Sequence, residues 1–380
     1  MILLTSDTET KPTPAMRQAI AEAEVGDEQK GEDPTVNRLL ERVADLLGKE
    51  AALFLPGGTM CNFVAIKVHT RPADAILADH MAHIIRAESA GAAFSSGVMI
   101  EPIASERGIF TPEALEQALR KLSSASSPYG PPARLLCVEQ THNFGGGAVW
   151  QLEQLQAVCA RARHSNLAIH MDGARLLNAV VATQTPAWEF AACVDSVWID
   201  FTKGLGAPVG AVLAGSREFI QEARRHKHIF GGALRQAGIV AAGCLYALDH
   251  HIDRLQTDHD HAKLLAQGLN TIDGIRVRST SPETNMVFFD VSGLGLDQAS
   301  FLTLLQQQGV KMGAVGAYIR AVTHLDISQE AIETAIQSVA QIAGQKWENL
   351  EAVRHPQRSW WLDECDRPKG GWLSLKVSVG

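Results

Sequence analysis

Long apolar runs, a basic leader and a surplus of positive charge are all missing from this 380-residue chain. The longest uncharged stretch, 51–66, has 16 residues and is interrupted by a proline and two glycines, whereas a membrane-spanning helix needs about 20 apolar residues. The first ten residues contain Asp7 and Glu9 but no basic side chain, so no signal peptide is predicted. Basic residues number 34 against 42 acidic ones, for a net charge of −8. We therefore expect neither a membrane nor a nucleic acid as partner.

Paired cysteines are also lacking. The six cysteines are scattered, and no two are close enough for a CxxC motif; they lie at positions 61, 137, 159, 193, 244 and 365. In a chain of this length such spacing is typical of buried thiols in a reducing compartment. We expect a cytoplasmic protein.

The chain does contain a 46% share of hydrophobic residues and an alternation of helical and strand-like segments. Helices are predicted over 34–47, 59–68, 111–122 and 151–164. Short apolar strands are predicted over 51–55, 74–78, 134–138, 167–170, 196–199 and 210–214. Strands buried on both faces and separated by helices indicate an α/β fold with a mainly parallel sheet.

After Gly232 the pattern changes to one long helical region, 236–264, then a strand at 285–290 and helices at 299–308 and 329–342. This indicates a smaller α+β domain. We predict a large domain over 34–250 and a small domain over 251–345 that residues 1–33 join. A tail over 346–380 holds four of the seven tryptophans. Its alternating apolar residues predict a strand docked on this chain or on a partner subunit, unless the tail is an appended segment.

Three motifs carry candidate chemistry. Lys203 lies between an apolar strand and a glycine-rich turn, where a lysine is a candidate amine for covalent attachment to a carbonyl group, although surface lysines are commoner. Asp172 follows the strand at 167–170, at the sheet edge where open α/β folds bind ligands, but it also suits a helix N-cap. Gly57, Gly58 and Thr59 precede a helix whose first N–H groups attract a phosphate.

Two nucleotide-binding signatures are absent: there is no P-loop, and no GxGxxG follows the first strand. A reactive lysine, an aspartate for a pyridine nitrogen and a glycine-rich phosphate cup together indicate pyridoxal 5'-phosphate as the cofactor.

In these motifs and their order, the chain resembles the low-specificity L-threonine aldolases, fold-type I pyridoxal-phosphate enzymes of the β-eliminating lyase group. The matching segments run from Ser6 to His324: SDT (6–8), GEDPTVN (31–37), PGGTMCN (56–62), DHMAHI (79–84), THN (141–143), HMDGAR (170–175), TKGLGAPVG (202–210), GGALRQAG (231–238) and RAVTH (320–324). The resemblance implies an aspartate aminotransferase-like fold and a homodimer or homotetramer with shared active sites.

The resemblance also implies roles for the matching residues. Lys203 would hold the cofactor covalently, Asp172 would bond its pyridine nitrogen, and His83 would stack on its ring. The phosphate would lie on Gly57, Gly58 and Thr59, close to Arg235 of the partner subunit. Ser6, Arg175 and Arg320 would bind the substrate carboxylate, a task that suits the planar arginine fork; Arg175 would also lie near the ring hydroxyl.

The implied reaction is retro-aldol Cα–Cβ cleavage of L-threonine, L-allo-threonine or a related β-hydroxy-α-amino acid to glycine and an aldehyde. His83 and His142 are the candidates for taking the β-hydroxyl proton, because histidine titrates near neutral pH; a buried structural histidine is the alternative for His142. A β-eliminating lyase or an aminotransferase on the same fold stays open. A catalytically inactive relative is disfavoured by the intact Lys203, Asp172 and Arg320.

Three positions depart from the family pattern. Lys30 stands where a tyrosine is usual, Gly57 where serine or threonine is usual, and Glu88-Ser-Ala-Gly91 replaces an EAGG-like segment. Lys30 would favour acidic substrates such as a β-hydroxyaspartate.

Clusters of histidine and aspartate at 226–228, 250–251 and 258–261 resemble metal ligands but lack a defined metal-site spacing. We assign them to solvated or interface helix faces and predict no catalytic metal; a structural cation stays open.

Overall fold

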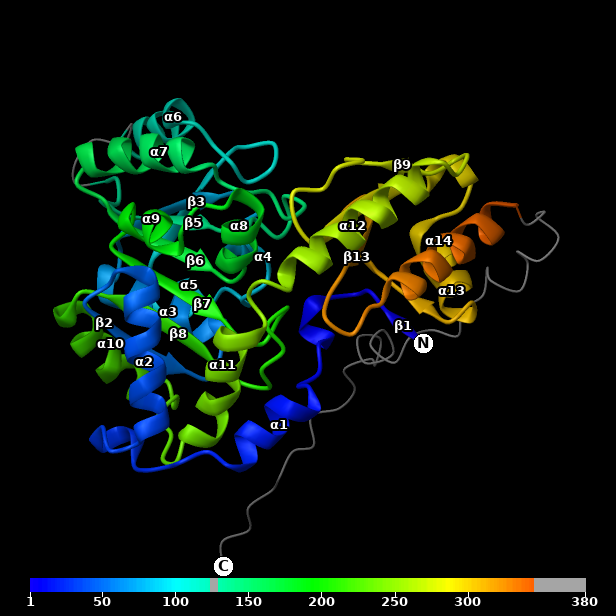
Figure 1. Cartoon of the computed structure of the whole chain (residues 1–380). Helices are drawn as coiled ribbons and strands as arrows, with labels where there is room; N and C mark the ends of the chain where they lie inside the picture. The colour runs from blue at the N-terminus through cyan, green and yellow to red at the C-terminus, as the bar shows by residue number, and fades with distance from the viewer. Residues whose placement is uncertain (124–128, 345–380) are drawn as a thin grey trace, which may run out of the picture.

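A seven-stranded sheet organises the larger part of the computed structural model, which describes residues 1–123 and 129–344 (Figure 1). Its strand order is β2-β8-β7-β6-β5-β3-β4. The strands are β2 (Ala51–Leu55), β3 (Ala75–Asp79), β4 (Met99–Ile103), β5 (Ala133–Glu139), β6 (Ala168–Gly173), β7 (Ser196–Asp200) and β8 (Ala211–Gly215). Neighbouring strands are parallel except for β8, which is antiparallel to both β2 and β7. The predicted α/β fold with a mainly parallel sheet is confirmed.

Both faces of this sheet are buried, because successive side chains of a strand point to opposite sides. Phe54 packs into the core on one face, whereas Leu53 and Leu55 pack on the other. The first face is covered by α2 (Pro34–Leu47), α6 (Pro112–Ser123), α7 (Leu152–His164), α8 (Leu176–Thr183), α9 (Ala187–Ala192) and α11 (Gly238–His250). The second is covered by α3 (Gly58–His69), α4 (His83–Arg86), α5 (Gly91–Ser96) and α10 (Arg217–Ile229).

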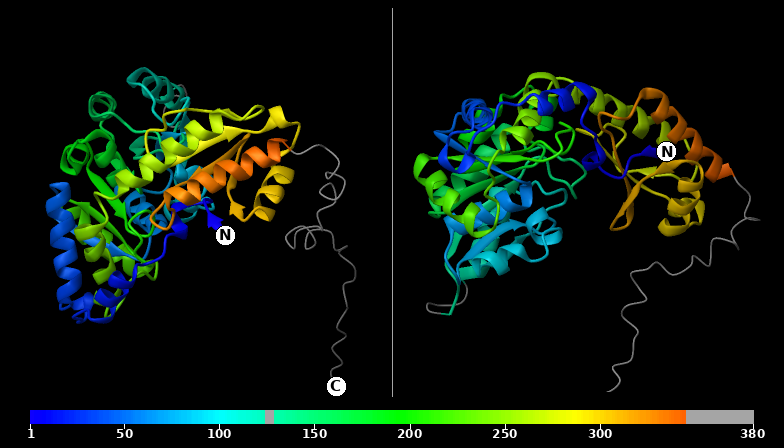
Figure 2. Two further views of the ribbon diagram at one scale, coloured as in Figure 1. Left: turned by 45° about the vertical axis from the view of Figure 1, so that its right-hand side comes forward. Right: turned by 90° about the horizontal axis from the view of Figure 1, so that it is seen from below.

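A second, smaller layer of sheet and helices lies beside the first (Figures 1 and 2). Its antiparallel sheet has the order β12-β13-β10-β9, with strands β9 (Arg276–Val277), β10 (Met286–Asp290), β12 (Gly313–Val315) and β13 (Tyr318–Val322). One face packs on α12 (Leu255–Asn270), α13 (Gln298–Gln307) and α14 (Gln329–Gly344). Phe288 and Arg320 are register partners on β10 and β13, and Arg320 reaches the cavity between the two bodies.

The N-terminal segment connects the two bodies. Strand β1 (Ile2–Leu3) pairs with β11 (Val310–Lys311) in the small domain, and Leu4 belongs to that domain's core. Helix α1 (Pro14–Ala21) instead buries Met16 in the core of the large sheet. The expectation that residues 1–33 join the small domain thus describes β1, while α1 packs on the large one. The domain boundaries stay a prediction, and the tail at 346–380 lies outside the described residues.

The region expected as one helix over 236–264 is two helices. Helix α11 ends at His250 and α12 begins at Leu255. Between them, the His251 ring bonds the carbonyl oxygen of Leu205 through Nδ1 at 2.7 Å, a contact from outside the helix that no local glycine or proline announces. Among residues 1–123 and 129–344, no helix is long and apolar enough to span a membrane.

Candidate active site

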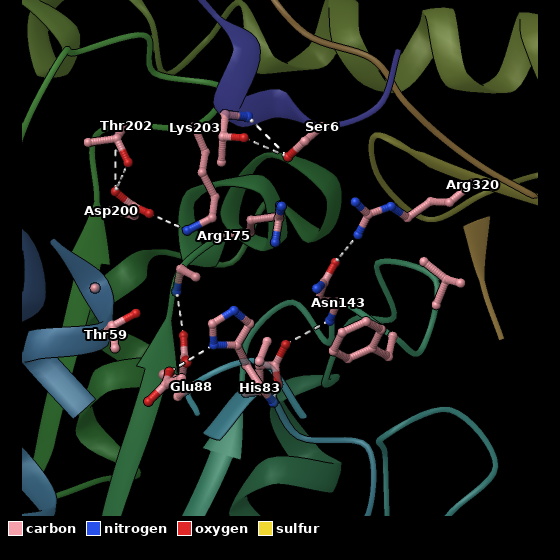
Figure 3. Close-up of a pocket in the computed structure, with 18 of the residues that line it drawn as sticks. Ser6, Thr59, His83, Glu88, Asn143, Arg175, Asp200, Thr202, Lys203 and Arg320 are labelled. Carbon is pink, nitrogen blue, oxygen red and sulfur yellow. Dashed lines mark hydrogen bonds and ion pairs between the residues drawn. The ribbon is translucent and has the colours of Figure 1, made fainter. Parts of the chain in front are cut away.

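A cavity of about 540 Å³ lies where the carboxyl ends of β5, β6 and β7 meet the small domain (Figure 3). Each of these strands delivers a carboxylate there: Glu139, Asp172 and Asp200. The cavity also brings together eight of the residues predicted from the sequence, namely Ser6, Gly58, Thr59, His83, Asp172, Arg175, Lys203 and Arg320. Because these come from distant parts of the chain, the fold alone unites them.

Lys203 follows β7, between that strand and the glycine-rich turn, as predicted from the sequence. Its amine contacts the carboxylate of Asp200, which also accepts hydrogen bonds from the backbone and the hydroxyl of Thr202 at 2.9 and 2.8 Å. The Lys203 Nζ lies 5.7 Å from the centre of the Trp198 ring. The lysine is therefore tethered at the cavity wall, with its amine available to a carbonyl group inside.

Asp172 is buried at the end of β6. One carboxylate oxygen accepts the N–H of Ala174 at 3.0 Å, and the other accepts Nδ2 of Asn62 at 2.9 Å. Burial, with help from the nearby Glu139, raises the pKa of Asp172 to about 6. A carboxylate that is costly to ionise in a buried position is a strong partner for a positively charged ring nitrogen, because pairing lowers the free-energy cost of burying each charge.

His83 lies at the first turn of α4. Its Nδ1 is 2.7 Å from Oε1 of Glu88, and its backbone N–H donates to Glu139 at 2.9 Å. Burial by itself lowers the pKa of His83, but the hydrogen bond to Glu88 and the neighbouring carboxylates outweigh it, so that the pKa is raised. With Nδ1 occupied by Glu88, Nε2 is the ring nitrogen left for a ligand.

Two arginines of the cavity have different partners. Arg175 is ion-paired with Asp7, whose two carboxylate oxygens accept Nε and Nη2 at 2.7 Å each, while Nη1 makes neither of these bonds. Among residues 1–123 and 129–344, Arg320 has no carboxylate partner: Nη1 donates to the Asn143 side chain and Nη2 to the Thr5 carbonyl, both at 3.0 Å, and its buried Nε has no hydrogen-bond acceptor. Arg320 is thus the arginine whose charge is left for an anionic ligand.

The N-terminus of α3 forms the opposite end of the cavity. Gly57 is its N-cap and supplies no side-chain hydrogen bond. A Cβ at Gly58 would lie 2.1 Å from the Trp198 ring, so only glycine fits there. The free N–H groups of this first turn and the helix dipole suit a phosphate. Lysine, aspartate, histidine and helix terminus together fit pyridoxal phosphate.

His142 was expected at the reacting atoms, but its ring does not line the cavity. It is 1% exposed, its Nδ1 accepts the N–H of Gly145 at 3.0 Å, and its Nε2 lies 3.2 Å from Asp79. A Cβ at Gly108 would lie 2.1 Å from the ring. The geometry favours the alternative of a structural histidine, one that supports the loop presenting Asn143.

Three other predicted residues also lie outside the cavity. Gly57 borders an adjoining apolar groove with Phe63, Phe94 and Phe230. Arg235 is 62% exposed and pairs with Asp27 at 3.0 Å. Lys30 is exposed at the end of a 3-10 turn, Glu28–Lys30, so within one subunit it does not reach the cavity.

The histidine clusters of the helices are engaged elsewhere. His226 lies 3.3 Å from Glu222, and Asp258 pairs with Arg254. In the described ranges, the group with three potential ligand atoms within 4.8 Å of one another is His83, Glu88 and Asp172. An amide N–H donates to both of its carboxylates, an arrangement that opposes a cation.

Comparison with known proteins identifies the family. The profile of the β-eliminating lyases matches residues 4–292. Low-specificity L-threonine aldolase 1 of Arabidopsis thaliana is 41% identical over 330 residues, covering 86% of this chain and 91% of the relative. The chain belongs to this aldolase family. The low-specificity L-threonine aldolase of Escherichia coli K12 is 39% identical over 87% of this chain and 96% of its own length.

A solved structure supports the same assignment at the level of the fold. The threonine aldolase of Leishmania major superposes with a TM-score of 0.77 at 19% identity, over 90% of this chain and 100% of that one. The family assignment makes the chain a lyase with pyridoxal phosphate as its cofactor, as its motifs predicted.

Several residues that line the cavity were not predicted from the sequence: Glu88, Glu139, Asn143, Trp198 and Asp200. Asp7, the partner of the cavity residue Arg175, was not predicted either. Asp7 adjoins Ser6 in the SDT segment that matches the family, and Glu88 begins the segment 88–91 that replaces the EAGG-like segment of the family. Glu139 and Asp200 each come directly after a predicted strand, at 134–138 and 196–199, and Asp172 was predicted from the same kind of position.

Proposed function

We propose that this lyase cleaves L-threonine, L-allo-threonine or a related β-hydroxy-α-amino acid into glycine and an aldehyde. The observation that carries the proposal is one cavity holding a tethered lysine, a buried carboxylate and an arginine without an acidic partner among the described residues. An α-amino acid presents a carboxylate, which Arg320 suits, and an amine, which can react with the carbonyl group of a cofactor held at Lys203.

The cofactor supplies an electron sink for a bond broken at Cα. The bond that breaks is set by how the substrate is held. Arg320 fixes the carboxylate, with Ser6 beside it on the same wall, and Asp172 holds the far side of the cofactor site. With the carboxylate restrained, the Cα–H and Cα–Cβ bonds are left, and a base at the β-hydroxyl favours cleavage of the Cα–Cβ bond.

Removal of the β-hydroxyl proton falls to His83 in this proposal. Its ring lies in the cavity, its Nδ1 is bonded to Glu88, and its Nε2 is free to accept a proton. A positioned general base contributes about 10²–10⁴-fold to the rate. His142 is packed beneath Gly108 and Gly145 and does not line the cavity, so we assign it no part in this step.

We further propose a homodimer or homotetramer in which subunits share sites. Within the described part of one subunit, the basic side chains lining the cavity are His83, Arg175, Lys203 and Arg320, and none belongs to the α3 end. Exposed Arg235 of a partner subunit would supply that cation. The apolar groove with Phe94, which is 91% exposed, adjoins this end and would be covered in the assembly. Lys30 would enter by the same route.

The described cysteines, 61, 137, 159, 193 and 244, are free thiols. This supports the proposal of a cytoplasmic location, where thiols stay reduced.

Product analysis tests the function. Purified protein with pyridoxal phosphate is incubated with threonine, allo-threonine, phenylserine and β-hydroxyaspartate in parallel, and glycine, aldehyde, keto acid and ammonia are measured. We expect glycine and aldehyde in equal amounts. Keto acid with ammonia would favour the eliminating lyase, and keto acid formed with an amino acceptor would favour the aminotransferase. Preference for β-hydroxyaspartate would support a role for Lys30.

The Lys203→Ala variant tests the attachment site. We expect no cofactor to stay on the chain after borohydride reduction and denaturation, as measured by mass spectrometry, whereas the wild type gains the mass of one cofactor. Lys49, which donates to the Val194 carbonyl, provides a matched control. Cofactor trapped on Lys203→Ala at another residue would contradict the assignment.

A further inference from the structure

Asn62 lies directly behind the cavity and contacts nothing inside it. It follows Gly58 by one turn of α3 and is fully buried. Its side chain makes four hydrogen bonds, with Trp198, His170, Glu88 and Asp172. A side-chain amide offers two donors and two acceptor positions, so every one is used. A buried amide that is fully satisfied occupies a single orientation.

The orientation of this amide follows from the chemistry of its partners. The indole nitrogen of Trp198 can only donate, and it lies 2.8 Å from Oδ1 of Asn62. The oxygen therefore faces Trp198, and Nδ2 faces the carboxylates, at 2.7 Å from Glu88 and 2.9 Å from Asp172. Each carboxylate receives one N–H from the same nitrogen.

A chain of hydrogen bonds continues behind Asn62. Because its oxygen accepts, Nε2 of His170 donates to it at 3.2 Å, and Nδ1 of His170 then accepts from Ser196 at 2.8 Å. Ser196 in turn accepts from Nε2 of His69 at 2.8 Å. Burial lowers the pKa of His170 to about 3 and that of His69 to about 4, so both rings are neutral at physiological pH. The network contains no charged group, and it orients Asn62 so that Nδ2 donates to Asp172.

The hydrogen bond from Asn62 opposes the effect of the surroundings on the pKa of Asp172. Burial and the acidic groups Glu139 and Glu88 raise the pKa of Asp172, whereas His83 and the bond from Asn62 lower it. The thiols of Cys61 and Cys137 lie in the same field and are neutral, since burial raises the pKa of each. Together with the backbone N–H of Ala174, the amide is thus an uncharged group that favours the ionised form of Asp172.

We propose that Asn62 is a positioning residue that holds two parts of the cofactor site with one amide: Asp172, which faces the pyridine nitrogen, and Glu88, which orients His83. It acts through these carboxylates and touches neither cofactor nor substrate. The proposal rests on the proposed function for the identity of the cofactor and for nothing else. Loss of the amide loosens cofactor binding and moves the ionisation of the site at the same time.

Two substitutions separate this role from simple packing. Asn62→Asp has nearly the same shape and keeps an oxygen for Trp198 and His170, but replaces the two donors by an oxygen facing two carboxylates. Asn62→Ala removes both the oxygen and the two N–H donors. Asn178→Ala is the control, because Asn178 is also a buried amide, bonded to His259 at 3.2 Å and outside the cavity. Circular dichroism and cofactor-free unfolding establish that each variant is folded.

The readouts are the dissociation constant for pyridoxal phosphate, by equilibrium dialysis, and the pH dependence of the bound cofactor's visible absorbance. A hydrogen bond to a charged group stabilises it enough to move a pKa by about one to two units. In both Asn62 variants we expect the transition at the acid end of the absorbance–pH curve to move up by about one to two pH units. We expect the dissociation constant for pyridoxal phosphate to rise about tenfold or more. Asn178→Ala should match the wild type in both measurements.

Wild-type affinity and an unshifted limb in folded Asn62→Asp would overturn the proposal, whatever Asn62→Ala does. A loss of stability in the Asn62 variants with both readouts unchanged would assign Asn62 to packing alone. Failure of the wild type to bind pyridoxal phosphate would instead count against the proposed function, so the two failures are distinguishable.

Discussion

Gly57 leaves the N-terminus of α3 without a side-chain cap, at the place where the family usually has serine or threonine. Its backbone is extended, with φ −170° and ψ 167°, and a Cβ there would meet nothing within 4 Å. Serine fits this conformation, and its hydroxyl would accept an N–H of the first turn. We expect Gly57→Ser to stabilise the cofactor-free chain by about 0.5–1 kcal/mol, measured by urea unfolding.

Gly231 provides the contrast for that measurement. A Cβ there also meets nothing within 4 Å, but φ is +74°, a conformation that costs a non-glycine residue about 1–2 kcal/mol. Gly231→Ser should therefore lower stability. Equal effects at the two glycines would contradict the capping argument.

The pKa of Asp172 gives a second prediction at this scale. In the cofactor-free chain this carboxyl has a pKa of about 6, so it is charged above that pH and protonated below it. We expect the affinity for pyridoxal phosphate to fall by about tenfold per pH unit below 6, because the ring nitrogen loses its charged partner. Binding should be nearly independent of pH in this range for Asp172→Asn, which should fold but lose most of its activity. A wild-type affinity that stays level down to pH 5 would contradict it.

Residues whose chemistry is visible in one segment were predictable. Lys203 and Asp172 each follow a predicted strand, Arg320 was assigned through the family resemblance, and all three line the cavity. Asn62, Asp7 and Glu139 act through partners far away in the chain, as in the bond between Arg175 and Asp7, and no local pattern indicates such pairs. His142 failed to reach the cavity because its orientation depends on Gly108 and Asp79, which come from other segments.

Among the elements, α10 is joined to the turn Glu28–Lys30 by a buried ion pair. Lys227 and Glu28 are 1% and 7% exposed at their side chains, and Glu28 also binds the 231–235 segment through the N–H of Leu234 at 3.4 Å. This pair holds together the two segments that carry Lys30 and Arg235.

Breaking this pair on one side should be costly. Lys227→Met leaves the Glu28 carboxylate buried without a cation, and we expect a loss of about 3–5 kcal/mol in the free energy of unfolding. The double variant Lys227→Met/Glu28→Gln should recover part of that loss, because the orphaned charge is gone. Arg42→Met, which breaks an exposed pair with Asp249, should cost about 1 kcal/mol or less. A double variant no more stable than the single one would refute this account.

Helices and strands with clear periodicity were predicted closely, including α2 at 34–47 and β2 at 51–55. The break between α11 and α12 was not predicted; it lies at His251, whose ring bonds the distant carbonyl of Leu205. Periodicity reports the apolar face of a helix and carries no information about such a tertiary contact.

At the scale of the whole molecule, Asp7 joins three parts. It lies in the N-terminal segment, pairs with Arg175 of the large domain, and accepts Nδ2 of Asn285 beside β10 at 3.2 Å. Burial alone raises the pKa of Asp7, but Arg175 outweighs it, so the pKa is held well below its usual range. The pair therefore contributes its full free energy of stabilisation at pH values above the ordinary pKa of a carboxyl group. That contribution is lost as the pH falls from there toward the lowered pKa of Asp7.

We expect Asp7→Asn to cost about 3 kcal/mol of unfolding free energy at neutral pH and to raise KM for the amino acid, because Arg175 loses its fixed position. The difference in stability from the wild type should shrink on acidification below about pH 4. Acid and urea unfolding measure the first effect, and initial rates measure the second. A difference that stays constant across the acid range would show that Asp7 acts through packing rather than charge.

Helix α12 begins in one core and ends in the other: Leu255 packs with the large sheet, and Ala262 and Leu265 with the small one. Lys203 stands on the first body and Arg320 on the second (Figures 1 and 3). The separation of the two anchors is therefore a property of the joint between the bodies. An amine without an α-carboxylate engages one body only and does nothing to hold them together. Selection for α-amino acids thereby depends on how the joint places the two bodies, and on the shape of neither domain alone.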